Sequence, residues 1–363
     1  MRVLHLNSEK TWRGGEQQMA YLSEELYHHG VKNFFAFPAE NEKLISFCKE
    51  NEFGYKFLSF GGLQLLASLQ LFFYLRKNKI DLIHTHTAKA HTVAVWASIF
   101  GRKIKVIVSK RTDFPVKSPY KFHHRSVKAI VCVSNKIEEI TRDGMHPKKR
   151  DLVQTIHSGV NLKRFDKPQV SLKEKHDIPE EKILIGNCSA IADHKDYATF
   201  VDTAQILNEA APDKFHFIII GNGPDEEKIK KYVELKMLKN KFTFTGFIND
   251  LETKLKSLDI FLMTSKEEGL GTSLLDAMLC EVPIVSTNAG GIPEIVIHEK
   301  TGLLAGIKQP KALANSVLRL LEDEELKNTL IQNALRQVQE EYSKVLTAKK
   351  TYDLYQKIIH EDF

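Results

Sequence analysis

Two acidic side chains bracket a glycine-rich turn in the second half of the chain. Glu268 lies directly before Gly269 and Gly271, and Asp276 follows inside the helix-forming sequence TSLLDAML. Backbone N–H groups at such a helix start lack intrahelical partners and carry partial positive charge, so they can hold an anion. Carboxylates beside an anion site suit a ligand that is both a phosphate and a polyol. The turn therefore indicates a nucleotide-sugar site, although any α/β protein could contain a similar strand, turn and helix.

Histidines, an arginine and an acid follow apolar segments in the first half of the chain. His84 and His86 end the segment 81–87, and Arg111 and Asp113 follow the next apolar segment. In a parallel sheet, ligands bind outside the carboxyl ends of the strands. We therefore expect these side chains to lie at the ligand-binding edge of a sheet.

The elements that would position these residues are alternating strands and helices. The alternation runs from the first residues and predicts an α/β fold with parallel, doubly wound sheets. It includes a helix expected at 248–259 and a helical last stretch with a break near Tyr342–Ser343. A polar, proline-containing segment at 161–182 interrupts it and predicts a hinge. Because 363 residues exceed the usual size of a single core, we expect two similar domains, at 1–165 and 166–342.

Composition narrows the class of protein. The hydrophobic content of 42% is ordinary for a soluble globular protein, and the first residues lack the pattern of a signal peptide. The longest apolar runs, such as 93–100, are far shorter than the roughly 20 residues that span a bilayer. No cysteine or acid lies at zinc-ligand spacing from a histidine. The cysteines are widely spaced, as is typical of buried residues in a reducing cytoplasm: Cys48, Cys132, Cys188 and Cys280.

Charge is unevenly shared between the two halves. Residues 1–165 contain 27 Lys and Arg against 14 Asp and Glu, a net +13, whereas residues 166–363 contain 25 against 32, a net −7. A basic first domain suits an anionic surface, either lipid headgroups or a nucleic acid. Lysine and arginine are densest at 102–150, and few aromatic residues alternate with them there, which disfavours binding to nucleic acid. The segment 63–79 predicts an amphipathic helix with a basic end, so we expect peripheral contact with an anionic membrane.

At EEGLGTSLLDAM, with GGIPE behind it, the sequence resembles the retaining glycosyltransferases of the GT-B fold, family four. Further motifs are similar to the family in the same order: WRGGEQQ, IVCVS, IHSGVNLKRF, NCSAIADHKD, IIIGNGPDEE, FTFTGF and TYDLY. The resemblance covers most of the chain. It implies two Rossmann-like domains that face each other across a cleft, with the last helix, 343–363, packing back on the first domain.

The resemblance also implies roles for individual residues. Glu268 would bind the sugar hydroxyls and Asp276 the ribose, while Lys195 matches a lysine that binds the diphosphate. His86 matches a histidine that points at the reacting sugar. The other implied donor contacts are Gly14, Gly15, Phe247, Gly269, Leu270, Gly271 and Thr272. Acceptor or diphosphate contacts are expected from Arg13, Arg111, Asp113 and Glu294.

Two positions depart from the family pattern. Ala190 stands where the family usually has an arginine five residues before the phosphate-binding lysine, so one cation is missing or supplied elsewhere; Arg13, Arg111 and Lys266 are candidates. Asp276 stands where the family has a glutamate, and it reaches about 1.5 Å less far. Its ribose contact is plausible either directly or through water.

The expected chemistry is transfer with retention from a UDP- or GDP-sugar to an envelope glycolipid, lipopolysaccharide or polysaccharide acceptor. No pair of carboxylates suggests a glycosidase-like nucleophile, so Glu268, His86 and Lys195 are expected to position groups and stabilise charge. No D-x-D motif occurs, and we expect neither a metal nor another cofactor. The alternatives are a soluble acceptor, a nucleotide-sugar epimerase and a non-catalytic nucleotide-binding protein. We expect a cytoplasmic protein that contacts the inner membrane face.

Overall fold

The computed structural model describes residues 1–61, 64–100, 104–116, 119–248 and 250–360. The chain forms two compact units: Met1–Val160 with Lys344–Phe363, and Asn161–Ser343. The first boundary lies before residue 165, the position expected from sequence. Phe165 is buried and Arg164 pairs with Asp276, so both residues belong to the second unit. The first residue of the expected helix 63–79 and residues 361–363 of the expected last helix lie outside the described residues.

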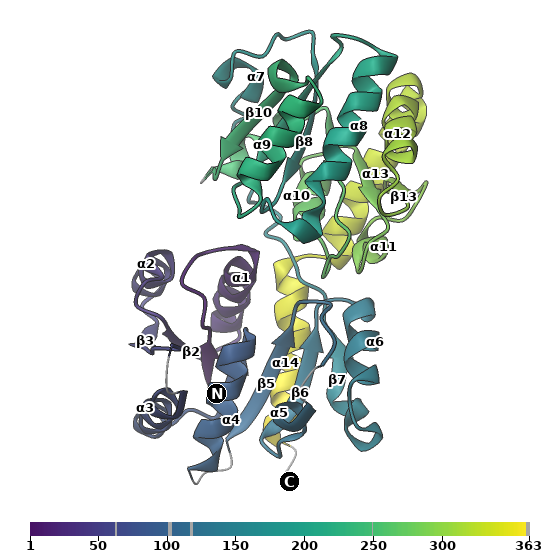
Figure 1. The fold of residues 1–363 in the computed structure, drawn as a ribbon. Helices are drawn as coiled ribbons and strands as arrows, with labels where there is room; N and C mark the ends of the chain where they lie inside the picture. Colours follow the sequence, from purple (N-terminus) through teal and green to yellow (C-terminus); the bar gives the residue numbers. More distant parts are fainter. Residues whose placement is uncertain (62–63, 101–103, 117–118, 249, 361–363) are drawn as a thin grey trace. The chain divides into compact units, whose positions relative to one another are not determined.

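The first unit is built on a seven-stranded parallel sheet of order β3-β2-β1-β4-β5-β6-β7 (Figure 1). Its strands are β1 Arg2–Leu6, β2 Lys32–Phe37, β3 Gly54–Phe57, β4 Leu82–Thr85, β5 Lys105–Lys110, β6 Val127–Cys132 and β7 Val153–Thr155. Its helices are α1 Gly14–His28, α2 Glu42–Glu50, α3 Gln64–Lys77, α4 Ala88–Ile99, α5 Pro119–His123, α6 Asn135–Asp143 and α14 Lys344–His360.

The last helix belongs to the core of the first unit. Ala348, Tyr355 and Ile358 of α14 are buried in one cluster with Val3 of β1 and Leu82 of β4. The yellow α14 lies against the purple and blue elements of this unit in Figure 1. Residues from both ends of the chain therefore make one core.

The second unit contains a six-stranded parallel sheet of order β10-β9-β8-β11-β12-β13. Its strands are β8 Ile183–Cys188, β9 Phe215–Ile220, β10 Phe242–Gly246, β11 Ile260–Met263, β12 Ile284–Thr287 and β13 Leu303–Ala305. Its helices are α7 Leu172–Lys175, α8 Tyr197–Ala210, α9 Glu226–Leu235, α10 Thr272–Leu279, α11 Ile292–Ile295, α12 Pro310–Glu322 and α13 Glu324–Glu341.

Short 3-10 turns complete the loops of the second unit. Turn η2 spans Asp193–Lys195, and η4 and η5 span Leu251–Thr253 and Leu255–Ser257. The sequence at 248–259 predicted a single helix, which is wrong for its described residues. Leu255 and Leu258 are both buried there, so packing against the unit overrides the local helix propensity.

None of the helices in the described part of the chain has both the length and the apolar character needed to cross a bilayer.

Candidate active site

Two glycine-containing loops meet at the carboxyl ends of the neighbouring parallel strands β11 and β12. The loop after β11 leads to α10, whose start is capped by Gly271 in a left-handed conformation at φ +89°. The loop after β12 passes directly against it, because the backbone N–H of Gly291 donates to the carbonyl of Glu268 at 3.0 Å. A Cβ at Gly290 would lie 2.0 Å from that carbonyl oxygen. The close approach therefore fixes the backbone that carries Glu268.

Glu268 and Lys195 meet at this loop, as two residues of one ligand site should. Lys195 ends η2, after strand β8, and its ammonium forms an ion pair with Oε2 of Glu268. Both side chains are only 13% exposed. Ser265 Oγ donates to the same carboxylate oxygen at 3.3 Å. The pair therefore places a cation and a carboxylate side by side at the loop.

The start of α10 is open to an anion. No side chain caps it, and its first turn contains no acidic residue. The N–H groups of its first turn therefore keep their partial positive charge for a ligand. Leu270 is buried below the turn, whereas Gly269 and Thr272 are partly exposed.

Asp276 is buried one turn further along α10. Arg164 Nη1 lies 3.4 Å from Asp276 Oδ2, and Arg164 Nη2 lies 3.8 Å from Glu252 Oε2. Burial raises the pKa of Asp276 to about 6, an effect that Arg164 opposes and Glu252 reinforces. The sequence did not predict the roles of Arg164 and Glu252, although Arg164 lies within the motif IHSGVNLKRF.

The remaining expected contacts of the second unit lie on nearby loops. Lys266 Nζ pairs with Asp193 Oδ2 at 2.5 Å, and its backbone N–H donates to His194 at 2.9 Å. Phe247 follows Gly246 and is 56% exposed. Glu294 is partly buried in the short helix α11, and Ala190 follows β8.

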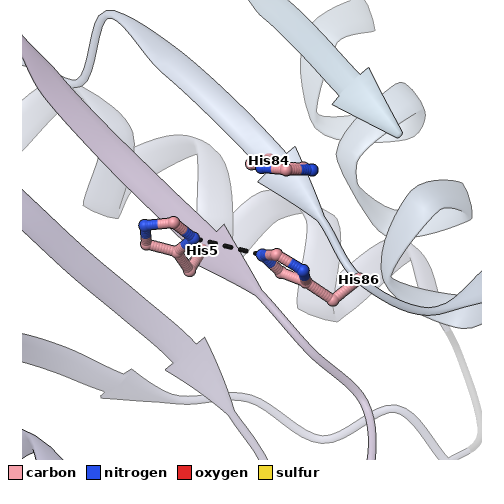
Figure 2. Close-up of side chains that lie close together, drawn as sticks. All are labelled: His5, His84 and His86. Carbon is pink, nitrogen blue, oxygen red and sulfur yellow. Dashed lines mark hydrogen bonds between the residues drawn. The ribbon is translucent and has the colours of Figure 1, made fainter. Parts of the chain in front are cut away.

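In the first unit, three histidines come together at the carboxyl ends of β1 and β4. His5 of β1 is the register partner of His84 of β4, and His86 follows directly. Figure 2 shows His5 and His86 joined by a hydrogen bond, with 3.1 Å between Nδ1 of His5 and Nε2 of His86. Arg111, after β5, places Nη2 3.2 Å from Nδ1 of His86. The sequence predicted His86 and Arg111 here but missed His5.

These histidines are neutral because they are buried. Burial lowers the pKa of His5 to about 4 and lowers the pKa values of His84 and His86 well below the ordinary value. One nitrogen from each ring lies within 4.8 Å of the others, which is close enough for a metal ion. Each ring nitrogen nevertheless has a hydrogen-bond partner: those of His84 lie 2.5 Å from Tyr355 Oη and 2.8 Å from Ser109 Oγ.

The start of α1 lies at the same edge of this sheet. Glu16 accepts from the backbone N–H of Arg13 at 3.0 Å and from Asn7 Nδ2 at 2.8 Å. A Cβ at Gly15 would meet nothing within 4 Å. Gly14 and Arg13 are exposed, and Asp113 is partly buried after β5. Within the first unit itself, Gly15 has open space beside it.

Two protein-family models match the chain. The family model for glycosyl transferases group 1 matches residues 169–337, and the model for glycosyltransferase family 4 matches residues 12–164. The chain is 25% identical over 300 residues to N-acetyl-alpha-D-glucosaminyl L-malate synthase of Bacillus anthracis, covering 79% of this chain and 77% of that one.

Two further comparisons extend this likeness. The chain is 24% identical over 307 residues to the UDP-Gal:alpha-D-GlcNAc-diphosphoundecaprenol alpha-1,3-galactosyltransferase of Escherichia coli, covering 79% of this chain and 78% of that one. The fold is similar to Anabaena Alr3699/HepE, with a TM-score of 0.84 at 18% identity over 98% of this chain and 100% of that one.

Proposed function

Because the chain belongs to glycosyltransferase family 4, we propose that it transfers a sugar from a UDP- or GDP-sugar, with retention, to a cell-envelope glycolipid or polysaccharide intermediate. The chain is a glycosyltransferase; the donor, the stereochemistry and the acceptor are the proposal. The observation that carries it is the meeting of Lys195 and Glu268 beside the open start of α10.

Each of these groups has a distinct task in the proposed reaction. The α10 N–H groups hold the donor diphosphate, and Lys195 neutralises the charge that develops on it as the glycosidic bond breaks. Glu268 accepts hydrogen bonds from the sugar hydroxyls and keeps Lys195 in place until the donor arrives. Asp276 accepts from the ribose. These residues stabilise charge and orient the donor, and none of them is proposed as a nucleophile or requires a metal.

The acceptor part of the proposal draws on the relatives. The E. coli relative is named for a diphosphoundecaprenol acceptor. So is a transferase of Campylobacter jejuni, 24% identical over 378 residues, which cover 94% of this chain and 98% of that one. A lipid-linked acceptor requires the enzyme to reach a membrane surface.

An exposed apolar surface on α3 and α4 suits that requirement, and we call it the α3–α4 face. The two helices pack together, with the rings of Phe72 and Phe100 6.1 Å apart. Phe73 is 61% exposed and Ile99 62% exposed. Arg76 and Lys77 end α3 with positive charge. The exposed members of the face are Leu65, Leu66, Leu69, Phe73, Trp96, Ile99 and Phe100. Apolar side chains bordered by cations favour an anionic bilayer.

The proposal is tested in two steps. Thermal-shift measurements with UDP, GDP and their sugars identify the donor, because a ligand at 100 times its Kd stabilises a protein by about 2.7 kcal/mol. That donor is then incubated with a polyprenyl-diphosphate-linked sugar, and the product linkage is determined by NMR. Retention of the donor's α configuration is expected. A β-linked product would contradict the mechanism, and donor isomerisation without any acceptor would favour an epimerase.

A soluble acceptor is the second candidate, since the B. anthracis relative is named for L-malate. Full activity with small hydroxylated acceptors in the absence of lipid would favour it.

A further inference from the structure

A hydrogen-bonded chain of side chains in the first unit has a direction that can be read from its two ends. At one end, Arg111 Nη2 lies 3.2 Å from His86 Nδ1. A guanidinium can only donate, so His86 Nδ1 accepts and has no proton. The neutral ring must then have its proton on Nε2, which lies 3.1 Å from His5 Nδ1. His86 therefore donates to His5.

The other end of the chain requires the same direction. Asn33 Nδ2 donates to the carbonyl of Ser23 at 2.9 Å, which turns Asn33 Oδ1 toward His5. His5 Nε2 lies 3.1 Å from that oxygen and so donates to it. His5 Nδ1 is thereby the acceptor that His86 needs. The order of donation is Arg111 to His86 to His5 to Asn33, and both histidines are neutral.

Arg111 is the charged end of this hydrogen-bonded chain. Among the described residues, no carboxylate forms an ion pair with it, and its Nε is buried without a hydrogen-bond partner. Glu16 influences the pKa of Arg111 through its charge alone, and its two carboxylate oxygens accept hydrogen bonds from Asn7 and from the backbone of Arg13. Burial lowers the pKa of Arg111 to about 10, so it keeps its charge at neutral pH. Arg111 is partly buried, and a cation with a buried, unpartnered Nε is destabilising unless an anion binds it.

We infer that Arg111 is an anion receptor that binds a phosphate oxygen of a substrate, and that His86 and His5 are positioning residues that aim it. The inference rests on the proposed function, which supplies two phosphate-bearing substrates: the nucleotide-sugar donor and a lipid-diphosphate acceptor. It changes the expected role of His86. Both of its ring nitrogens are occupied, so His86 holds Arg111 instead of touching the reacting sugar.

The same geometry disfavours a metal ion at the three histidines. A metal would need unprotonated nitrogens from the rings, and it would replace hydrogen bonds that each ring already makes. It would also lie beside the positive charge of Arg111. In the described part of the chain, the side chains that hydrogen-bond to the three rings include no carboxylate that could offset the charge of a metal ion and Arg111.

Two binding measurements separate the two phosphate sources. The Kd of UDP, or of GDP if that nucleotide is the donor's, is measured by calorimetry. The KM of a polyprenyl-diphosphate-linked sugar is measured at saturating donor. We expect Arg111→Gln to weaken one of these at least tenfold and Arg111→Lys to recover part of the loss. The exposed Arg125→Gln serves as the matched control and should change neither. If both values stay within twofold of wild type in folded Arg111→Gln protein, the inference is overturned.

Nuclear magnetic resonance tests the positioning role. With ¹⁵N-labelled histidine, wild-type His86 should show an unprotonated Nδ1 and a protonated Nε2 that do not change between pH 6 and pH 8. His5→Gln can still accept from His86, so it should leave that pattern in place, whereas His5→Leu should lose it and weaken the same binding step as Arg111→Gln. A reversed tautomer, or Zn²⁺ binding that shifts the three rings, would refute the hydrogen-bonded chain. If wild-type protein bound neither UDP nor GDP and transferred no sugar, the proposed function would fail instead.

Discussion

Glu268 and Lys195 form an ion pair, so a change at either residue also alters the surroundings of the other. Replacing Glu268 with Gln removes the acceptor for the sugar hydroxyls and leaves a mostly buried ammonium without its partner. We expect Glu268→Gln to lower kcat roughly 100-fold or more, the range typical for loss of one preorganised electrostatic contact. Steady-state transfer kinetics measure the effect.

The neighbouring acid provides the control for that change. Glu267 is exposed on the same loop, so Glu267→Gln should retain wild-type activity and melting temperature. Activity of Glu268→Gln within a few-fold of wild type would place the donor site elsewhere.

We expect donor binding to depend on pH through Asp276. Its pKa is raised to about 6 by burial, and only the ionised form can accept two ribose hydrogen bonds. The KM for the donor should therefore increase as pH falls through about 6. Arg164 opposes the raised pKa, so Arg164→Met should move the increase to higher pH. Donor KM profiles between pH 5 and 8 test this.

Folding stability should respond to Asp276 in the opposite sense. Because the folded pKa lies above the unfolded value of 3.8, protonation favours the folded state at low pH, and this contribution is lost as pH rises through about 6.

Asp276→Asn, which cannot ionise, should bind donor weakly with a KM that no longer varies with pH. Charged groups that influence Asp276 are Arg164 and Glu252, and both must stay intact in that comparison.

The sequence identified the residues of this site that follow local patterns and missed those brought in by folding. Glu268 and the α10 start were recognisable from their glycine turn, and Lys195 from the family resemblance. Arg164 reaches Asp276 from 112 positions away, and His5 meets His86 only through the β1–β4 register. Neither partner has a spacing that a single sequence reveals.

At the scale of elements, the loop after β12 supports the loop that carries Glu268. Gly290 has φ +51°, and any side chain there would collide with the Glu268 carbonyl. Gly290→Ala should cost at least about 1–3 kcal/mol from backbone strain and should lower activity by displacing Glu268. Thermal unfolding and transfer rates measure the two effects.

Gly61 provides a suitable comparison, because a Cβ there would meet nothing within 4 Å. Gly61→Ala should leave both quantities near wild type. Equal melting temperatures for the two variants would show that the close approach at Gly290 does not constrain the loop.

The order of helices and strands was predictable because hydrophobic periodicity and the glycine and proline residues that end elements are local features of the sequence. The two parallel-sheet Rossmann-like units expected from strand–helix alternation are confirmed. The helix break expected near Tyr342–Ser343 is confirmed between α13 and α14. The helix expected at 248–259 was wrong, because burial of Leu255 and Leu258 depends on contacts across the unit.

For the whole molecule, acid should destabilise the first unit more than the second. The second unit has two histidines with lowered pKa values, His176 and His216, whereas the first unit has more: His5, His84, His86, His91, His123 and His124. Below pH 6.5, the pKa of these rings in the unfolded chain, the unfolded chain binds protons that the folded protein does not bind, so acid lowers the free energy of unfolding. His5 has a folded pKa of about 4, so below that pH its protonation lowers the free energy of unfolding by about 3 kcal/mol.

Hydrogen exchange followed by mass spectrometry resolves the two units separately. Protection in β1 and β4 should fall between pH 6.5 and pH 5, after correction for the intrinsic exchange rate, before protection in β9 does. Parallel loss of protection in both sheets would contradict a special role for the histidine cluster.

The position of α14 has a consequence for the order of events during synthesis. The ribosome makes strands β1 to β7 first, but the cluster around Val3 and Leu82 is closed by Ala348, Tyr355 and Ile358. His84 likewise lacks its hydrogen-bond partner, the hydroxyl of Tyr355, until α14 has been made. The second unit, Asn161–Ser343, is complete in sequence while the first still lacks a helix. The first unit is therefore begun before the second unit and completed after it, and part of its apolar core stays uncovered until α14 has been made.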